Sequence, residues 1–300
     1  MNLYRNPYEN LNNGRWLKTN FHIHAGTGPG TCGANPIPVV LDLYRQLKFD
    51  ALCISNHDMY TDTSSFGDEK LFLVQGVEYT NNPNPHMLTI GVSRTLHELP
   101  HQEAINETLK MGGFTILCHP NWKYRGFFSD EQIDALTGYA GVEIINMCVY
   151  RDTGSGLATD TWDHLLKQGK LVYGFGSDDL HWLTDADRSS TYIYAKSRDY
   201  AGIKDAVDCG RLFASTGIVL EYLELAESTI KVKAKFPNDT YINKFIYRFV
   251  SGNGTVKESF GEYAEYIITN EDYVRAEVIA ENGAMLFTQP VYKTDFFKKA

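Results

Sequence analysis

The sequence predicts an α/β domain, built of strand–helix units around a parallel sheet or barrel, followed by a small all-β domain. From about residue 17 to 175, short apolar runs alternate with amphipathic stretches. After Gly210, β-branched and aromatic residues instead alternate between turn-forming clusters. Hydrophobic residues make up 43% of the 300 residues and aromatic residues 13%, which suffices for a sizeable core and excludes a disordered, collagenous or coiled-coil chain.

Seven apolar runs of strand length mark the α/β half of the chain. In sequence order they read WLKTNFHIH, ALCISNH, LFLVQGVEY, MLTIGV, FTILCHP, GVEIINM and LVYGFGSDD. Between them, apolar residues recur at helical spacing. The helices that this spacing predicts cover residues 36–47, 101–111, 129–136, 160–168 and about 200–209. Pro36 stands at a helix start, and Ser129 followed by Gln132 has the pattern of a capping box.

The last third of the chain has the pattern of a β-sandwich. Short strands such as TIKVKAKF, KFIYRFV and YVRAEVIA recur between clusters of Ser, Asn, Gly and Asp. We therefore expect an α/β domain over residues 1–217 and a sandwich-like domain over 218–300, with GRLFAST at the junction.

Charge and composition restrict the partners. A net charge of −9 leaves no basic surface for a nucleic-acid duplex, and no window approaches the ~18 apolar residues of a membrane span. The N-terminus lacks the features of a signal peptide. The five widely spaced cysteines fit buried free thiols better than a disulfide framework or a thiolate zinc site. We expect a cytoplasmic protein with a small-molecule substrate, and homo-oligomerisation stays open.

Histidines gather at the ends of the predicted strands, where six of the nine lie. His22 and His24 alternate on one strand and therefore point to the same face, and Asp179 and His181 repeat this spacing. Glu78 follows an apolar run, where a carboxylate is costly unless it is neutral, paired or bound to metal. The other strand-end histidines are His57, His86 and His119.

These strand ends meet on one rim if the strands surround a barrel. Imidazole and carboxylate are ligands of divalent metal ions, so we predict two sites that share Glu78. The first would use His22, His24 and Asp179, and the second His86 and His119.

The order of these motifs resembles the polymerase-and-histidinol-phosphatase (PHP) superfamily of metal-dependent phosphoesterases. The resemblance covers about residues 17–217 and ends in G-R-L-F-A-S-T-G. The motifs that carry it are N-F-H-I-H at 20–24, I-S-N-H-D at 54–58, V-Q-G-V-E at 74–78, P-H-M-L-T-I-G at 85–91, I-L-C-H-P at 116–120 and G-S-D-D-L-H at 176–181. The β-domain and the ending Q-P-V-Y resemble a branch that includes carbamate and aryl-ester hydrolases.

The resemblance implies a distorted (β/α)7 TIM-like barrel with two or three divalent ions of zinc, manganese or iron. It assigns the two ligand sets above to the first and second metals and implies that His57 and His181 face a third. Members with three metals usually place Asp or His five or six residues after H-x-H, where this chain has Pro29 and Gly30. The candidates to complete the third site are Asp58, Asp178 and Cys32, and Asn56 replaces the more usual Asp before His57.

We therefore predict a phosphoesterase that cleaves a small phosphate mono- or diester with a metal-bridging hydroxide. The alternatives are a metal-dependent hydrolase of a non-phosphate ester, carbamate or amide, and a non-catalytic metal-binding module. Glu78 would be catalytic through the shared hydroxide, and His57 or His181 would be the general acid if the third metal is absent. The candidates to bind the substrate's phosphate or carboxylate are Lys123, Arg125 and Arg188.

Overall fold

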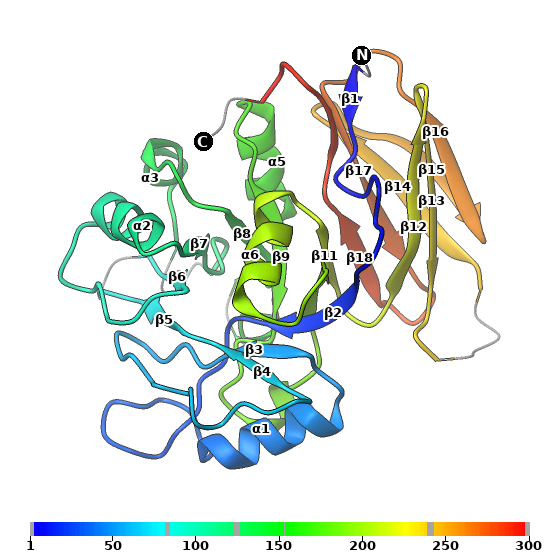
Figure 1. Cartoon of the computed structure of the whole chain (residues 1–300). Helices are drawn as coiled ribbons and strands as arrows, with labels where there is room; N and C mark the ends of the chain where they lie inside the picture. The colour runs from blue at the N-terminus through cyan, green and yellow to red at the C-terminus, as the bar shows by residue number, and fades with distance from the viewer. Residues whose placement is uncertain (1–2, 82–84, 123–126, 153, 239–242, 298–300) are drawn as a thin grey trace.

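The computed structural model describes residues 3–81, 85–122, 127–152, 154–238 and 243–297. Within them, Figure 1 shows a mixed α/β region, which carries the helices, beside a β-rich region of long antiparallel strands. The predicted mixed α/β architecture is confirmed.

The five predicted helices form close to their expected positions. The helices are α1 (Ile37–Gln46), α2 (His101–Lys110), α3 (Asp130–Ala135), the short α4 (Met147–Tyr150), α5 (Thr159–Lys167), the 3-10 turn η1 (Leu183–Asp185) and α6 (Tyr200–Asp208). The Ser129 hydroxyl accepts the Gln132 backbone N–H and the Gln132 side chain accepts the Ser129 N–H, so the predicted capping box is confirmed. Helix α4 was not predicted, because a single turn has too few residues to show a helical period.

Strands form at all seven predicted apolar runs, one of which holds two strands, and two further strands, over residues 190–195 and 212–215, were not predicted. The strands of the α/β region are β2 (Arg15–Asn20), β3 (Ala51–Cys53), β4 (Phe72–Val74), β5 (Gly76–Tyr79), β6 (Met87–Ile90), β7 (Phe114–Leu117), β8 (Gly141–Asn146), β9 (Tyr173–Ser177), β10 (Ser190–Ala195) and β11 (Leu212–Ser215). The prediction of one strand over LFLVQGVEY is wrong, because β4 pairs parallel with β3 while β5 pairs antiparallel with β6. A Cβ on Gly76, where β5 begins, would lie 2.6 Å from Cys53 Sγ, so the close approach at this change of sheet requires glycine.

The paired strands form two sheets, and a closed (β/α)7 barrel is not confirmed. One sheet has the order β5-β6-β7-β8-β9, and β6 is antiparallel to both neighbours. The chain between β5 and β6 is too short for the helical crossover that parallel strands need. The larger sheet includes β11-β10-β2-β3-β4. Single bridges between Ile23 and Leu180 and between His57 and Glu78 join the two sheets, and we call these two junctions the seams.

The β-rich region continues the larger sheet. Its strands are β12 (Val219–Ala226), β13 (Thr229–Lys235), β14 (Phe245–Ser251), β15 (Gly254–Gly261), β16 (Tyr263–Ile267), β17 (Tyr273–Ile279), β18 (Met285–Thr288) and β19 (Val291–Lys293). Strands β12, β13 and β16 form a three-stranded sheet that shares one apolar core with β14, β17 and β18. Strand β18 pairs with β11, and β1 (Tyr4–Arg5) pairs with β19. The domain boundary at residue 217 stays a prediction. The larger sheet has strands on both sides of this residue, and Tyr4 and Tyr8 from the N-terminus pack into the apolar core of the β-rich region.

Buried polar contacts tie the two regions together. Arg275 of β17 is 1% exposed and makes two hydrogen bonds of 2.9 and 2.8 Å to Asp163 of α5. The Gln289 side chain pairs with both backbone groups of Gly174 in β9 at 2.9 Å. All five cysteines are free, as predicted, but only Cys53 and Cys118 are buried, and Cys32 and Cys209 are exposed. Among the described helices, none is long and apolar enough to cross a membrane.

Candidate metal centre

The candidate ligands lie at the two seams. At one, the His24 backbone N–H donates to the Leu180 carbonyl at 2.9 Å. At the other, the Glu78 N–H donates to the Ser55 carbonyl at 3.1 Å. His119 and Asp179, which follow β7 and β9, have φ of 28° and 49°. A non-glycine residue in the left-handed region is strained, and such strain clusters at functional sites. The ends of separate strands thus bring all eight predicted metal-ligating residues to one end of the α/β region.

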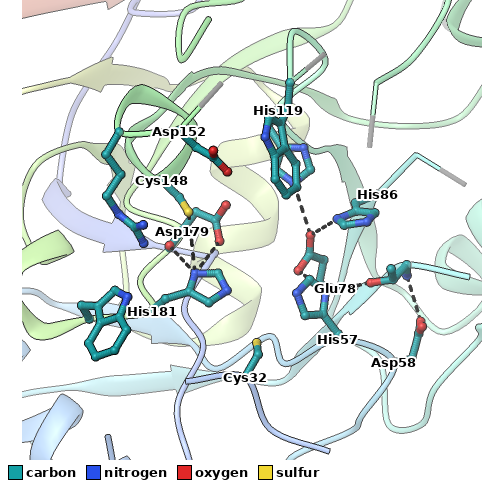
Figure 2. A pocket seen from close by; sticks show the side chains of 14 residues that line it. Cys32, His57, Asp58, Glu78, His86, His119, Cys148, Asp152, Asp179 and His181 are labelled. Atoms are coloured by element: carbon teal, nitrogen blue, oxygen red, sulfur yellow. Dashed lines mark hydrogen bonds and ion pairs between the residues drawn. The ribbon is translucent and has the colours of Figure 1, made fainter. Parts of the chain in front are cut away.

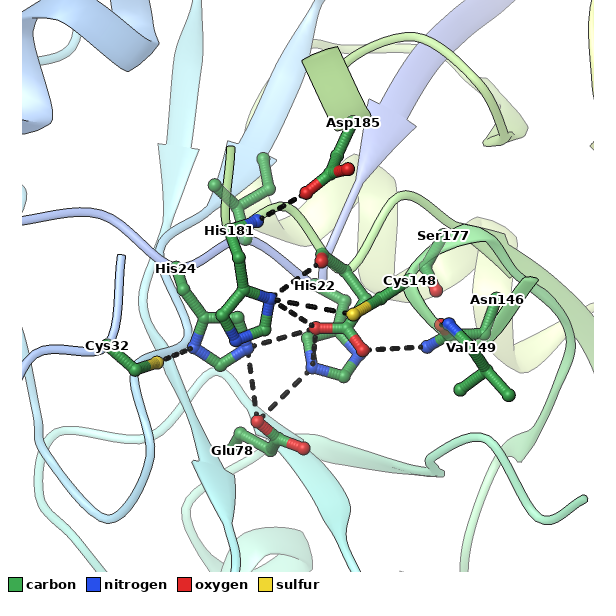
Figure 3. A network of polar contacts seen from close by, with 12 residues as sticks. His22, His24, Cys32, Glu78, Asn146, Cys148, Val149, Ser177, His181 and Asp185 are labelled. Atoms are coloured by element: carbon green, nitrogen blue, oxygen red, sulfur yellow. Dashed lines mark hydrogen bonds and ion pairs between the residues drawn. The ribbon is translucent and has the colours of Figure 1, made fainter. Parts of the chain in front are cut away.

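Four ligand atoms meet at the first predicted site. The Nε2 atoms of His22 and His24 each lie 3.2 Å from both Glu78 Oε2 and Asp179 Oδ1. All four atoms are buried and have no hydrogen-bond partner among the described residues. A tetrahedral ion with bonds of about 2.0 Å keeps its ligand atoms about 3.3 Å apart, and each of these four nitrogen–oxygen distances is close to that value. His22, His24 and Asp179 form one group that could hold a divalent ion, and Glu78 Oε2 lies beside it. Figure 3 shows both rings directed at Glu78.

The carboxylates around His22 are arranged for a cation. Burial favours the neutral imidazole, but Asp179, Glu143 and Glu78 outweigh it and raise the pKa of His22 well above its usual value. The same concentration of negative charge stabilises a divalent ion held by the neutral ring.

The second site uses the other oxygen of Glu78. Oε1 lies 2.8 Å from His86 Nδ1 and 3.4 Å from His119 Nε2, as Figure 2 shows. Glu78 therefore has one oxygen near the residues of each predicted site, an arrangement in which a carboxylate can bridge two ions. His57 Nδ1 lies 2.8 Å from Oε2 on the cavity side.

Of the three candidates to complete a third site, only Cys32 joins the histidines. Cys32 Sγ lies 3.2 Å from His24 Nδ1, in a group that includes His57 and His181. Burial favours the neutral thiol, but hydrogen bonds with His181, His24 and His57 lower the pKa of Cys32 to about 4. The carboxylates of Asp58 and Asp178 accept backbone N–H groups instead.

A further buried carboxylate, which the sequence analysis missed, contacts the predicted ligands His22 and His119. Glu143 of β8 is 1% exposed and accepts hydrogen bonds from His22 Nδ1 at 2.7 Å and the His119 backbone N–H at 2.9 Å. Ser177 Oγ and Asn146 Nδ2 donate to it as well. The signal was present in GVEIINM, because a carboxylate inside an apolar run meets the criterion that singled out Glu78.

The replacement of Asp by Asn before His57 has a local explanation. The Asn56 side chain pairs with both the backbone N–H and the carbonyl of Ala25, at 3.1 and 2.9 Å. It therefore braces the chain next to His24, while Thr80 Oγ1 contacts His57 Nδ1 at 2.8 Å. An amide can do this because it both donates and accepts.

A cavity of about 530 Å³ opens over the ligands (Figure 2). Besides ligands, it is lined by Arg151, Asp152, Trp122 and Trp182. Arg151, also missed, donates two hydrogen bonds of 3.0 Å to Asp185, which accepts the His181 and Trp182 backbone N–H groups as well.

Only one of the three predicted substrate-binding residues lies among the described residues. Arg188 is exposed and lies outside the lining of the cavity. Lys123 and Arg125 lie outside the described residues.

No family model and no curated protein matches the chain. Among solved structures it is similar to a two-domain protein from Bacteroides vulgatus containing a predicted PHP-like metal-dependent phosphoesterase. That match has a TM-score of 0.52 and 16% identity and covers 95% of this chain and 98% of the other.

Two further matches are weaker, each with a TM-score of 0.43. PsfC from Pseudomonas syringae is 12% identical over 60% of this chain and 82% of its own. The lesion-specific endonuclease PfuEndoQ from Pyrococcus furiosus is 11% identical, over 64% of this chain and 56% of its own. The match to the Bacteroides vulgatus protein supports the resemblance inferred from the motifs at the level of the fold.

Proposed function

We propose that this chain is a metal-dependent hydrolase that cleaves a small phosphate mono- or diester. The observation that carries the proposal is the group of buried, unpartnered atoms of His22, His24 and Asp179 with Glu78 Oε2 beside it. The second Glu78 oxygen is turned to His86 and His119. When bound, two divalent ions would lower the pKa of a water molecule and neutralise charge on the phosphate. Their charge exceeds that of Glu78 and Asp179, so the site attracts an anion despite the acidic chain.

The chain's own residues bind and orient the substrate. The cavity gives the substrate access to the histidines, since the side chains of His57 and His181 are 31% and 22% exposed. Arg151 uses Nε and Nη2 for Asp185, which holds its guanidinium plane and leaves Nη1 for an anionic group. His57 or His181 can act as the general acid only if no ion lies between them.

Chelation tests the proposed function. We expect the full chain, purified without added metal, to contain divalent ions and to hydrolyse 4-nitrophenyl phosphate. Removal of the ions should abolish turnover, and zinc or manganese should restore it, because the ligands alone have no nucleophile. Turnover that survives complete metal removal would contradict the proposal. Hydrolysis of nitrophenyl esters or carbamates but not of phosphates would support the alternative.

One observation favours that alternative, a non-phosphate ester, carbamate or amide. In the part of the chain that the structure describes, Arg151 is the one cationic side chain lining the cavity, and it is paired with Asp185. Asp58 and Asp152 add negative charge to the lining.

The cytoplasmic location, the absence of a nucleic-acid duplex partner and homo-oligomerisation stay predictions.

Replacement of Arg151 by alanine should separate the two substrate classes. A charge-assisted hydrogen bond contributes about 1.5–3 kcal/mol, so Arg151→Ala should raise KM for 4-nitrophenyl phosphate about tenfold or more. KM for a neutral nitrophenyl ester should not change. Arg188→Ala, which removes an exposed arginine outside the cavity, is the control. An unchanged KM for the phosphate in the Arg151 variant would show that this residue does not bind the anion.

A further inference from the structure

A loop that follows the second ligand histidine brings a thiol to the metal centre. The loop closes through hydrogen bonds from the Gly26 N–H to the Asn35 carbonyl at 2.8 Å and from the Ala34 N–H to the His181 carbonyl at 3.0 Å. A Cβ on Gly33 would lie 2.6 Å from the His24 carbonyl oxygen, so only glycine permits this approach. Cys32 thus stands beside His24 and His181 because of the path of the loop.

The thiol faces two imidazoles whose other nitrogen is already occupied. His57 Nδ1 lies 2.8 Å from both Glu78 Oε2 and Thr80 Oγ1. His181 Nδ1 lies 3.0 Å from the Asp179 carbonyl oxygen. One nitrogen of each ring and Cys32 Sγ lie within 4.8 Å of one another, so Nε2 of each ring remains for a shared partner. In Figure 2 the sulfur points toward these two rings.

We propose that Cys32, His57 and His181 hold a third divalent ion, and that the thiolate makes this position select zinc over manganese or magnesium. One thiolate and two imidazoles form a softer donor set than the carboxylate-containing sets of the first two sites. The contact of 3.2 Å between His24 Nδ1 and Cys32 Sγ lets His24, a ligand of the first site, donate to the sulfur and fix its own orientation.

This assignment rests on the proposed function and changes one part of it. With the third position filled, neither His57 nor His181 is free to donate a proton to the leaving group. The rate should then depend little on the leaving-group pKa, because an ion rather than an imidazole stabilises the departing oxygen.

Metal content and cobalt spectroscopy test the site without relying on activity. After reconstitution of the full chain with zinc, we expect three ions per chain, and two in Cys32→Ser. With cobalt, the unsubstituted protein should show a sulfur-to-cobalt charge-transfer band in the near ultraviolet, which Cys32→Ser should lose. Cys209→Ser removes an exposed thiol at the end of α6 and should leave both readouts unchanged.

The possible results separate this inference from the proposed function. Two ions in the unsubstituted protein, or three ions in Cys32→Ser, would overturn the third site while leaving a two-metal hydrolase intact. A cobalt–sulfur band that persists in Cys32→Ser and disappears in Cys148→Ser would overturn the assignment to Cys32, since Cys148 Sγ lies 3.8 Å from His181 Nδ1. Three ions with the band but no chelation-sensitive hydrolysis would support the site and refute the proposed function.

Discussion

Glu78→Gln is expected to abolish turnover and to remove both of the predicted shared-ligand metal ions. Glu78 is fully buried and gives Oε2 to the first site and Oε1 to the second. An amide carries no charge and offers one oxygen, so it cannot bridge two cations. Changes to groups that only orient ligands cost 10–100-fold, and loss of the shared ligand should exceed this, with kcat/KM falling on the order of 10³-fold or more.

The loss should also be visible without a substrate. In the unsubstituted protein, added zinc should raise the melting temperature, because an ion that binds only the folded state stabilises it. We expect this rise to disappear in Glu78→Gln, as measured by calorimetry with metal content determined in parallel. Glu98→Gln, which changes an exposed carboxylate outside the cavity, should behave as the unsubstituted protein. Two ions retained in Glu78→Gln would refute the shared site.

Glu143→Gln is the second substitution with a large expected effect, although Glu143 does not line the cavity. Its carboxylate accepts four hydrogen bonds. The donors are the His22 ring, the His119 backbone N–H and the side chains of Asn146 and Ser177. An amide NH₂ group in place of one oxygen is itself a donor, so it cannot accept the hydrogen bonds that this oxygen accepts. The His22 ring would lose the partner that fixes its tautomer, so metal affinity and kcat should fall about 10–100-fold.

Metal titration against a competing chelator measures this effect. Because Glu143 acts through the ligands and not on the substrate, KM at saturating metal should stay unchanged and excess zinc should recover part of kcat. Ser177→Ala removes one donor at 2.6 Å but keeps the carboxylate and is the matched control with a smaller expected loss. Unchanged metal affinity in a folded Glu143→Gln protein would show that this carboxylate does not position His22.

Local patterns predicted the features that depend on neighbouring residues. The capping box at Ser129 and the amphipathic helices follow from the contacts of residues three or four apart, which the sequence displays directly. His22 and His24 converge because alternate strand residues share a face. The eight residues predicted as ligands could be singled out because each stands at a strand end, and their combined pattern is stronger than any single histidine.

Features that depend on the path of the chain were not predictable in this way. The run LFLVQGVEY has the periodicity of one strand, yet Gly76 allows the chain to leave one sheet and enter the other. Glu143 and Arg151 have their roles through contacts with residues 121 and 34 positions away, respectively. Such contacts leave no periodic mark in the sequence.

The sequence by itself determined the types of ligand, their order and the strand ends that carry them, because periodicity and apolar runs are properties of adjacent residues. Only the tertiary structure decided which of Cys32, Asp58 and Asp178 lies among the histidines. Asp58 and Asp178 are occupied by backbone N–H groups, whereas the closed loop at Gly33 brings Cys32 against His24. That choice depends on which buried polar groups already have partners, and partners are set by the packing of distant segments.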